Sequence, residues 1–317
     1  MGNESIKLGI SFSQDAIRFI EAEVWESRIN ITSIVQVSMP EPFDYTTIGD
    51  PDLIPQYAHA IDKSLENFNS AIQAAPLCLD RKLAIKKTFA VDKGLSEKEI
   101  RQHIEWELEQ LLIAPRDEYN VGFEHAVLPH AKEDIIVFVA LRKAIVNYIE
   151  EIFKKSRLDL ISLDVDLFAS IRALKQAYAD KLKGLSALVE YNKTGIGFTL
   201  LLDGDYLLSD ELPLLMEDSP YFEHPSDELA QHTFHKIQSL VDRVQDNIEV
   251  NLSRILLSGE SADHAVLTPL EALAHESAVH MVEPFQNVHT QLNIESQLLA
   301  DERPQHFLPT LGMILKP

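Results

Sequence analysis

The twelve histidines are the first residues to consider as chemically active groups, because histidine binds metals and transfers protons near neutral pH. His232 and His235 are three residues apart in a segment with helical periodicity, so they could share one helix face. No third histidine or carboxylate completes a known zinc spacing around them. A surface or half-buried pair is therefore favoured, and we expect no metal site. Four further histidines are spread too evenly to indicate a site: His264, His275, His280 and His289.

Nucleophilic chemistry has equally little support in the sequence. Ser258 precedes Gly259, but no G-x-S-x-G motif surrounds it, so a hydrolase is disfavoured. The only cysteine, Cys78, lies in an apolar run and has neither a disulfide partner nor a CxxC pair. A single buried-type cysteine suits a reducing cytosol. We expect no catalytic residue among these groups.

The charge balance restricts the class of partner. The chain has 317 residues and a formal net charge of -22. Such a charge repels phosphate backbones and anionic lipids, which argues against nucleic-acid binding. Two interpretations remain open: a basic protein partner, or a charge that only keeps the protein in solution.

Membrane insertion is not predicted. The longest apolar run, residues 135–141, has the length of a buried strand. The N-terminus lacks a basic region followed by an apolar core, so we expect no signal peptide. Ile6 stands where the myristoylation pattern requires Ser or Thr.

The elements that must position any site follow a repeated order. Alternating apolar residues predict a three-stranded antiparallel meander over residues 6–37, followed by a helix over 53–74. A second meander starts near Gly184, with a hairpin at Asp203-Gly204, and a helix over 227–252 follows. The last helix is predicted at residues 308–315. The pattern indicates an α/β protein of two related lobes.

A small β-α-β-β module is inserted in the first half. Two short strands over residues 76–92 precede its helix, which begins at Ser96 with Glu99 completing a capping box. One apolar stripe marks the buried face of this helix. Trp106 lies off that stripe, and we interpret it as a packing residue or as part of a partner surface. The predicted division is 1–82 and 142–183 for the first lobe, 83–141 for the module, and 184–317 for the second lobe.

Several segments resemble the type IV pilus assembly protein PilM family, which is related to the cell-division protein FtsA. The likeness covers most of the chain in the family's order, and residues 140–174 are the most telling. The resemblance implies an actin-like (ribonuclease H-like) fold of the ASKHA superfamily. The segments concerned are LGISFSQDAIRFIE at 8–21, GLSEKEIRQHIEWELEQLLIAPRDEYNVGFE at 94–124, ALRKAIVNYIEEIFKKSRLDLISLDVDLFASIRAL at 140–174, LLSGESA at 256–262, VEPF at 282–285 and LPTLGMILK at 308–316.

The same resemblance places a nucleotide cleft and identifies departures in its first hairpin. Active members carry an Asp and then a Gly-containing turn there, which hold Mg and phosphate. Here Ser11 stands at the Asp position and Ser13 at the Gly position, with Gln14 beside it. Serine does not replace an anionic ligand of Mg. Arg18 stands where the family often has Lys, and it could face an anion or solvent.

Two further loops depart from the active pattern. The second hairpin has Glu190 and Asn192 where Asp-x-Gly is usual, although Asn tolerates a positive φ. In the adenosine loop, Gly259 is followed by Glu260 rather than by another glycine. Two unit charges about 5 Å apart repel by roughly 3 kcal/mol at a dielectric of about 20. A Glu260 that points into the cleft would therefore oppose a nucleotide.

The resemblance implies a scaffold or adaptor at the inner membrane of a type IV pilus, competence or secretion system. It would lie in the cytoplasm and bind the short tail of a membrane-anchored, PilN-like partner, in a groove between residues 6–37 and 83–141. We expect a pseudo-ATPase with no cofactor. The alternatives are an active ATPase or kinase that binds Mg-ATP, and an FtsA-like filament or tether.

Overall fold

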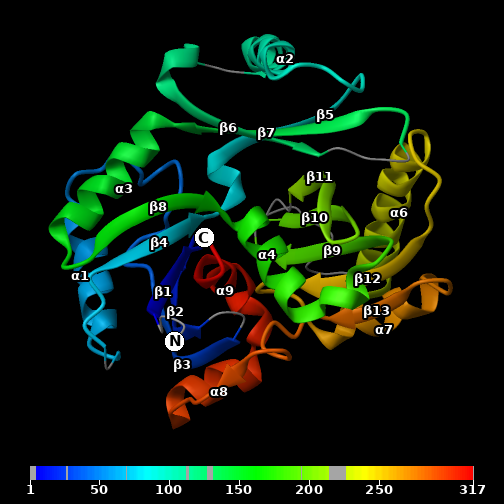
Figure 1. Cartoon of the computed structure of the whole chain (residues 1–317). Coiled ribbons are helices and arrows are strands. Elements are labelled where there is room, and N and C mark those ends of the chain that lie inside the picture. Colours follow the sequence, from blue (N-terminus) through cyan, green and yellow to red (C-terminus); the bar gives the residue numbers. More distant parts are fainter. Residues whose placement is uncertain are drawn as a thin grey trace.

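A computed structural model describes residues 5–25, 28–68, 70–111, 114–126, 131–193, 195–213 and 226–316. Figure 1 shows two lobes side by side, with a small sheet and one helix lying across both. None of the described helices is long and apolar enough to cross a bilayer.

The first lobe is built on a six-stranded sheet with the order β14-β3-β2-β1-β4-β8. The predicted first meander is confirmed, because β1 pairs antiparallel with β2 and β2 with β3. The strands β4 and β8 extend the sheet in parallel, so β8 forms one of its edges. The bounds are β1 Ser5–Phe12, β2 Ala16–Trp25, β3 Arg28–Ser38, β4 Ala74–Leu79, β8 Asp159–Val165 and β14 His289–Thr290.

Helices cover both faces of this sheet, which explains why its central strands are buried on both sides. On one face, α1 (Ile54–Leu65) and α3 (Lys143–Lys155) share an apolar cluster with β1 and β4. On the other, α4 (Asp166–Tyr178) and α9 (Leu308–Ile314) lie between the lobes. The predicted helix over 53–74 was too long. It ends at Leu65, and the side chain of Asn67 donates to the carbonyl of Ser64 in its last turn.

The inserted β-α-β-β module is confirmed as a three-stranded sheet with the order β5-β7-β6, covered by one helix. The capping box of that helix forms, with the Ser96 amide donating to Glu99 at 2.8 Å. Its apolar stripe packs on alternate residues of β7. The bounds are β5 Ala84–Val91, α2 Glu97–Leu111, β6 Tyr119–Ala126 and β7 Asp134–Arg142.

The second lobe repeats the meander in the sheet β11-β10-β9-β12-β13. Asp203 and Gly204 both have positive φ, 52° and 82°, as the predicted tight hairpin requires. The predicted helix over 227–252 was again too long, since it ends at Gln245 and a strand starts at Leu252. The bounds are β9 Leu185–Asn192, β10 Gly195–Leu202, β11 Asp205–Pro213, α6 Ser226–Gln245, β12 Leu252–Ser258, α7 His264–Leu273 and β13 Ala278–Met281.

The C-terminal segment returns to the first lobe, which corrects the predicted second lobe of 184–317. β14 pairs with β3, and α8 (Ile294–Glu302) is tied to the same strand because Ser296 bonds the backbone of Ile34. α9 lies directly against α4, and a Cβ at Gly312 would come within 1.8 Å of the Ala169 carbonyl. Figure 1 shows the orange α8 below β3 and the red α9 beside β1 and β2, at the centre of the molecule. The apolar periodicity within a segment does not reveal that the segment packs on a distant part of the chain.

Candidate functional site: an interlobe cleft and a groove beneath the module

The structure gathers the predicted cleft residues around one hollow of about 310 Å³ between the lobes. The β1–β2 hairpin contributes one wall, and the β9–β10 hairpin and the loop after β12 contribute the other. All eight predicted residues line it: Ser11, Ser13, Gln14, Arg18, Glu190, Asn192, Gly259 and Glu260.

The polar groups of the first hairpin are engaged within the chain. The Ser11 hydroxyl lies 2.6 Å from the Thr310 hydroxyl of α9 and is buried. The Ser13 hydroxyl accepts from Arg18 at 3.3 Å, and its backbone N–H closes the turn onto Ala16. Gln14 donates to Asp44 at 3.2 Å. The hairpin is therefore held in shape by side-chain contacts at the predicted Asp and Gly positions.

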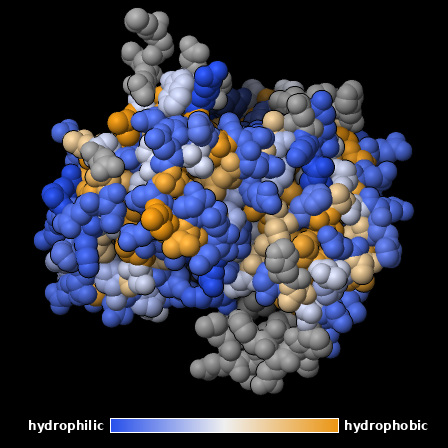
Figure 2. All heavy atoms as spheres, turned by 90° about the horizontal axis from the view of Figure 1, so that it is seen from below, coloured by the Kyte–Doolittle hydropathy of each residue, from blue (hydrophilic) through white to orange (hydrophobic). Residues whose placement is uncertain are grey.

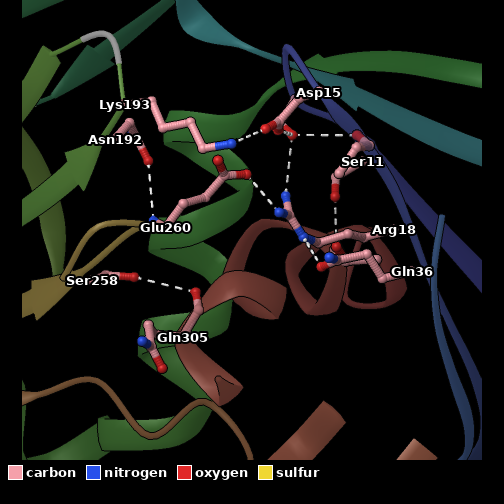
Figure 3. Close-up of polar contacts among 12 residues, drawn as sticks. Ser11, Asp15, Arg18, Gln36, Asn192, Lys193, Ser258, Glu260 and Gln305 are labelled. Atoms are coloured by element: carbon pink, nitrogen blue, oxygen red, sulfur yellow. Dashed lines mark hydrogen bonds and ion pairs between the residues drawn. The ribbon is translucent and has the colours of Figure 1, made fainter. Parts of the chain in front are cut away.

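Arg18 faces an anion, and that anion is Glu260. The residue is only 5% exposed; its guanidinium donates to Gln36 at 2.8 Å and to the Glu260 carboxylate at 2.5 Å. Figure 3 shows Glu260 reaching across the cleft toward Arg18, with Lys193 and Asp15 forming a second ion pair above it. Both pairs join the first lobe to the second. Glu260 does point into the cleft, but an internal cation compensates its charge.

A third ion-pair group lies deeper in the cleft, centred on Arg81 in the turn after β4. Its guanidinium contacts Glu190 at 2.6 Å and Asp166 at 2.8 Å, and all three side chains are largely buried. Burial raises the pKa of the Glu190 carboxyl, and the Arg81 charge opposes that shift. Burial also lowers the pKa of Arg81, but both carboxylates outweigh it and hold the group charged. The guanidinium thus occupies the space between two carboxylates that could otherwise ligate a divalent cation.

The loop at residues 259–261 closes the cleft from the second lobe. Gly259 has a φ of 97°, and a Cβ there would lie 2.3 Å from the Tyr191 carbonyl. That carbonyl accepts from the Ser261 N–H at 2.8 Å. Asn192 accepts from the Glu260 N–H at 3.4 Å and does not adopt the positive φ that its side chain would tolerate. Its contribution to the turn is therefore a hydrogen bond.

Two titratable groups of the cleft were missed in the sequence. Burial and the neighbouring Asp166 carboxylate raise the pKa of Asp80 to about 6. Burial and the Arg18 charge lower the pKa of His306 to about 4. Asp80 and Arg81 follow the buried strand β4 directly, and ligands of α/β sheets gather at such strand ends. That placement was a usable signal, whereas nothing local marks His306.

A second and larger hollow, of about 940 Å³, runs beneath the inserted module. We call it the β6–β8 groove, because the edge strands β6 and β8 lie on its two sides. Its module side carries Gly122 and Glu124 of β6 with Val139 of β7. Its other side carries Ile161 of β8, which is 64% exposed, and Phe168 of α4. The groove therefore combines apolar side chains with two sheet edges.

This hollow differs in position from the groove predicted between residues 6–37 and 83–141. The module forms one wall, but β8, α3 and α4 form the other, in place of the meander over 6–37. The sheet order explains the difference, because β4 lies between the meander and the edge strand β8.

Comparison with known proteins decides the family. Residues 9–211 match the family described as type IV pilus assembly protein PilM. The chain belongs to the PilM family. A solved PilM-PilN type IV pilus biogenesis complex contains a chain with a TM-score of 0.72 and 17% identity, over 98% of this chain and 99% of that one. The predicted actin-like fold is thereby confirmed, as is the resemblance.

Two further solved structures are more distant. A Bacteroides thetaiotaomicron protein with an actin-like ATPase fold has a TM-score of 0.46 at 13% identity, over 93% of this chain and 95% of that one. The cytoplasmic domain of Vibrio cholerae EpsL, from a type II secretion system, has a TM-score of 0.48 at 10% identity, over 99% and 96%. No curated protein sequence matches the chain.

Proposed function

We propose that this PilM-family chain is an adaptor that binds an extended segment of a membrane-anchored partner of the PilN type, without ATP turnover. It would lie at the cytoplasmic side of the inner membrane through that partner. The solved relative with the highest similarity quoted above is named as a PilM-PilN complex, which makes such a partner the first candidate. The observation that carries the proposal is the β6–β8 groove.

The groove suits an extended peptide because β6 and β8 each pair on one side only. A free strand edge offers backbone N–H and C=O groups to an added strand. Between these edges, Val139 and Leu141 of β7 form an apolar surface with Leu160 of β8. Backbone pairing would supply affinity, and the apolar surface would select alternate side chains of the peptide.

The charges of the groove favour a basic segment. Its two cations are already engaged, since Arg172 pairs with Asp164 at 2.7 Å and Lys154 with a neighbouring glutamate. Three exposed carboxylates have no ion-pair partner among the described residues: Glu124, Glu150 and Asp159. A juxtamembrane tail rich in Lys or Arg would complement them, and the net charge of -22 would steer it toward the protein.

The contacts of the cleft support the absence of turnover. Ser11 offers no anionic ligand for Mg, and Arg81 neutralises the two carboxylates nearest to it. Arg18, the cation best placed for a phosphate, is paired with Glu260. A nucleotide would have to displace these pairs, each of which is already preorganised. The competing function, an active ATPase or kinase, draws on the same cleft and its carboxylates.

Titration calorimetry with the cytoplasmic tail of the cognate PilN-type protein tests the proposal. Ile161→Asp places a charge in the groove, and Ile294→Asp makes the same change at an Ile of α8 outside it that is 82% exposed. We expect Ile161→Asp to weaken binding by at least about tenfold, which is 1.4 kcal/mol, and Ile294→Asp to leave it unchanged. If the wild-type protein does not bind the tail, or if both variants lose affinity equally, the groove is not the binding site.

A further inference from the structure

The outer face of α2 has an exposed tryptophan at its centre. Residues 102, 105, 106, 109 and 110 have the i, i+3, i+4 spacing of one helix face, and all are exposed. This face lies opposite the stripe of Ile100, Ile104 and Leu108 that packs on the module's sheet. Trp106 stands in the middle of it with 59% of its surface exposed. We call this surface the α2 outer face.

This indole is not part of the apolar cluster that α2 forms with the module's sheet among the described residues. The solvent face of an amphipathic helix is ordinarily polar, and Trp is among the residues most enriched at binding hot spots. Figure 1 shows α2 on the side of the module sheet that points away from both lobes, whereas the β6–β8 groove lies below that sheet. A partner on α2 would therefore not compete with a peptide in the groove.

The charges around Trp106 indicate the chemistry of the partner. Glu105 precedes it and Glu109 follows one turn later, and neither has an ion-pair partner within the described ranges. The arginine of this helix, Arg101, lies one turn before Glu105 and is paired with Glu97 at 2.7 Å. The face thus offers an aromatic ring flanked by two carboxylates without cations. An arginine would satisfy both features, because its guanidinium stacks on an indole and binds carboxylates in a fixed fork.

We infer that the α2 outer face is a docking surface for a basic, arginine-bearing segment of a second protein. A second copy of this chain would bring Glu105 and Glu109 against like charges. An anionic lipid surface would meet the same carboxylates on a chain whose net charge is -22. The inference is separate from the tail-binding function, since it concerns another surface and another partner.

Fluorescence anisotropy with a labelled peptide of alternating Arg and Gly tests the inference. The peptide should bind the full chain saturably, and Trp106→Leu should weaken binding by about tenfold. Glu105→Gln with Glu109→Gln should weaken it to a similar extent. Asp242→Asn with Asp246→Asn is the matched control, because it removes the same charge at the same spacing from two exposed positions, one in the last turn of α6 and one directly after its end. We expect the control to change the affinity by less than about twofold.

Five results would overturn the inference. The α6 control could weaken binding as much as the α2 pair, which would make the attraction unspecific. The groove variant Ile161→Asp could abolish binding, which would place the peptide in the β6–β8 groove. A Lys-Gly peptide could bind as tightly, which would remove the role of guanidinium stacking. Binding of the protein to vesicles of anionic phospholipid would identify a membrane as the occupant. Dimers in sedimentation that depend on Trp106 would identify a second copy of the chain.

Discussion

Arg18 of β2 and Glu260 of the loop after β12 form a 2.5 Å ion pair that joins the two lobes across the cleft. Both side chains are largely buried, with 6% and 15% exposed. Without Glu260, the Arg18 guanidinium would be available to a bound anion. Here the chain supplies the anion itself, so the contact that closes the lobes is intramolecular.

The first prediction concerns the energy of this pair. Glu260→Gln leaves the buried Arg18 charge uncompensated and should lower the free energy of unfolding by about 3 kcal/mol, the lower end of the range known for broken buried pairs. Arg18→Met should have a similar cost. The double variant should lose clearly less than the sum, because it leaves no unpaired charge. Urea unfolding of the four proteins measures this, and strictly additive losses would show that the two residues do not interact.

The second prediction concerns the close approach at Gly259. Gly259→Ala would place a Cβ 2.3 Å from the Tyr191 carbonyl at a φ of 97°. Gly49→Ala is the matched control, since Gly49 has a φ of 107° but no atom within 4 Å of the built Cβ. We expect about 1 kcal/mol of destabilisation at Gly49 from backbone strain and at least about 2 kcal/mol more at Gly259 from the clash. Equal melting-temperature shifts in the two variants would mean that the loop moves freely.

The third prediction concerns acid sensitivity. The pKa of His306 is lowered to about 4, from 6.5 for an unperturbed histidine, so the unfolded chain binds a proton first as the pH falls. Stability should therefore decline between about pH 6.5 and pH 4, by up to roughly 3 kcal/mol from this residue. His306→Asn should flatten the decline, whereas the same change at the exposed His275 should not. A wild-type slope that persists in His306→Asn would assign the acid sensitivity to other groups.

The fourth prediction concerns Asp80, whose contribution to stability changes with pH in the opposite direction to that of His306. The pKa of Asp80 is raised to about 6, so its contribution to stability is present below about pH 4 and is lost as the pH rises through 6. Asp80→Asn keeps the oxygen that accepts from the Lys82 N–H at 2.9 Å. The variant should be about 2 kcal/mol more stable than the wild type at pH 7.5, after discounting for partial exposure, and no more stable at pH 3.5. A benefit of the same size at both pH values would point to a cause other than ionisation.

Much of the fold was predictable because local patterns decide it. The two meanders, the capping box at Ser96 and the Asp203-Gly204 hairpin all follow from alternation and turn chemistry. Helix ends were predicted less well, because apolar periodicity does not encode contacts such as the bond from Asn67 to the last turn of α1. The return of β14, α8 and α9 to the first lobe depends on long-range packing.

The residues that line the cleft were predictable from the sequence, but the ion pairs among them were not. All eight residues came together because motif order follows the fold. The pairing of Arg18 with Glu260 joins residues 242 positions apart, and the position of Arg81 between Glu190 and Asp166 depends on the docking of three elements. The way the two lobes pack decides which charges meet in the cleft. The sequence therefore did not predict that Arg18 pairs with Glu260.

The affinity of the cognate PilN-type tail, measured by calorimetry with and without saturating Mg-ATP, tests the central claim most directly. An adaptor whose lobes are joined by its own ion pairs should bind the tail with the same affinity in both conditions, within about twofold. Binding that appears only with Mg-ATP, or tightens by more than about tenfold, would contradict the account, because it would show that the cleft still takes a nucleotide and uses it to control the groove.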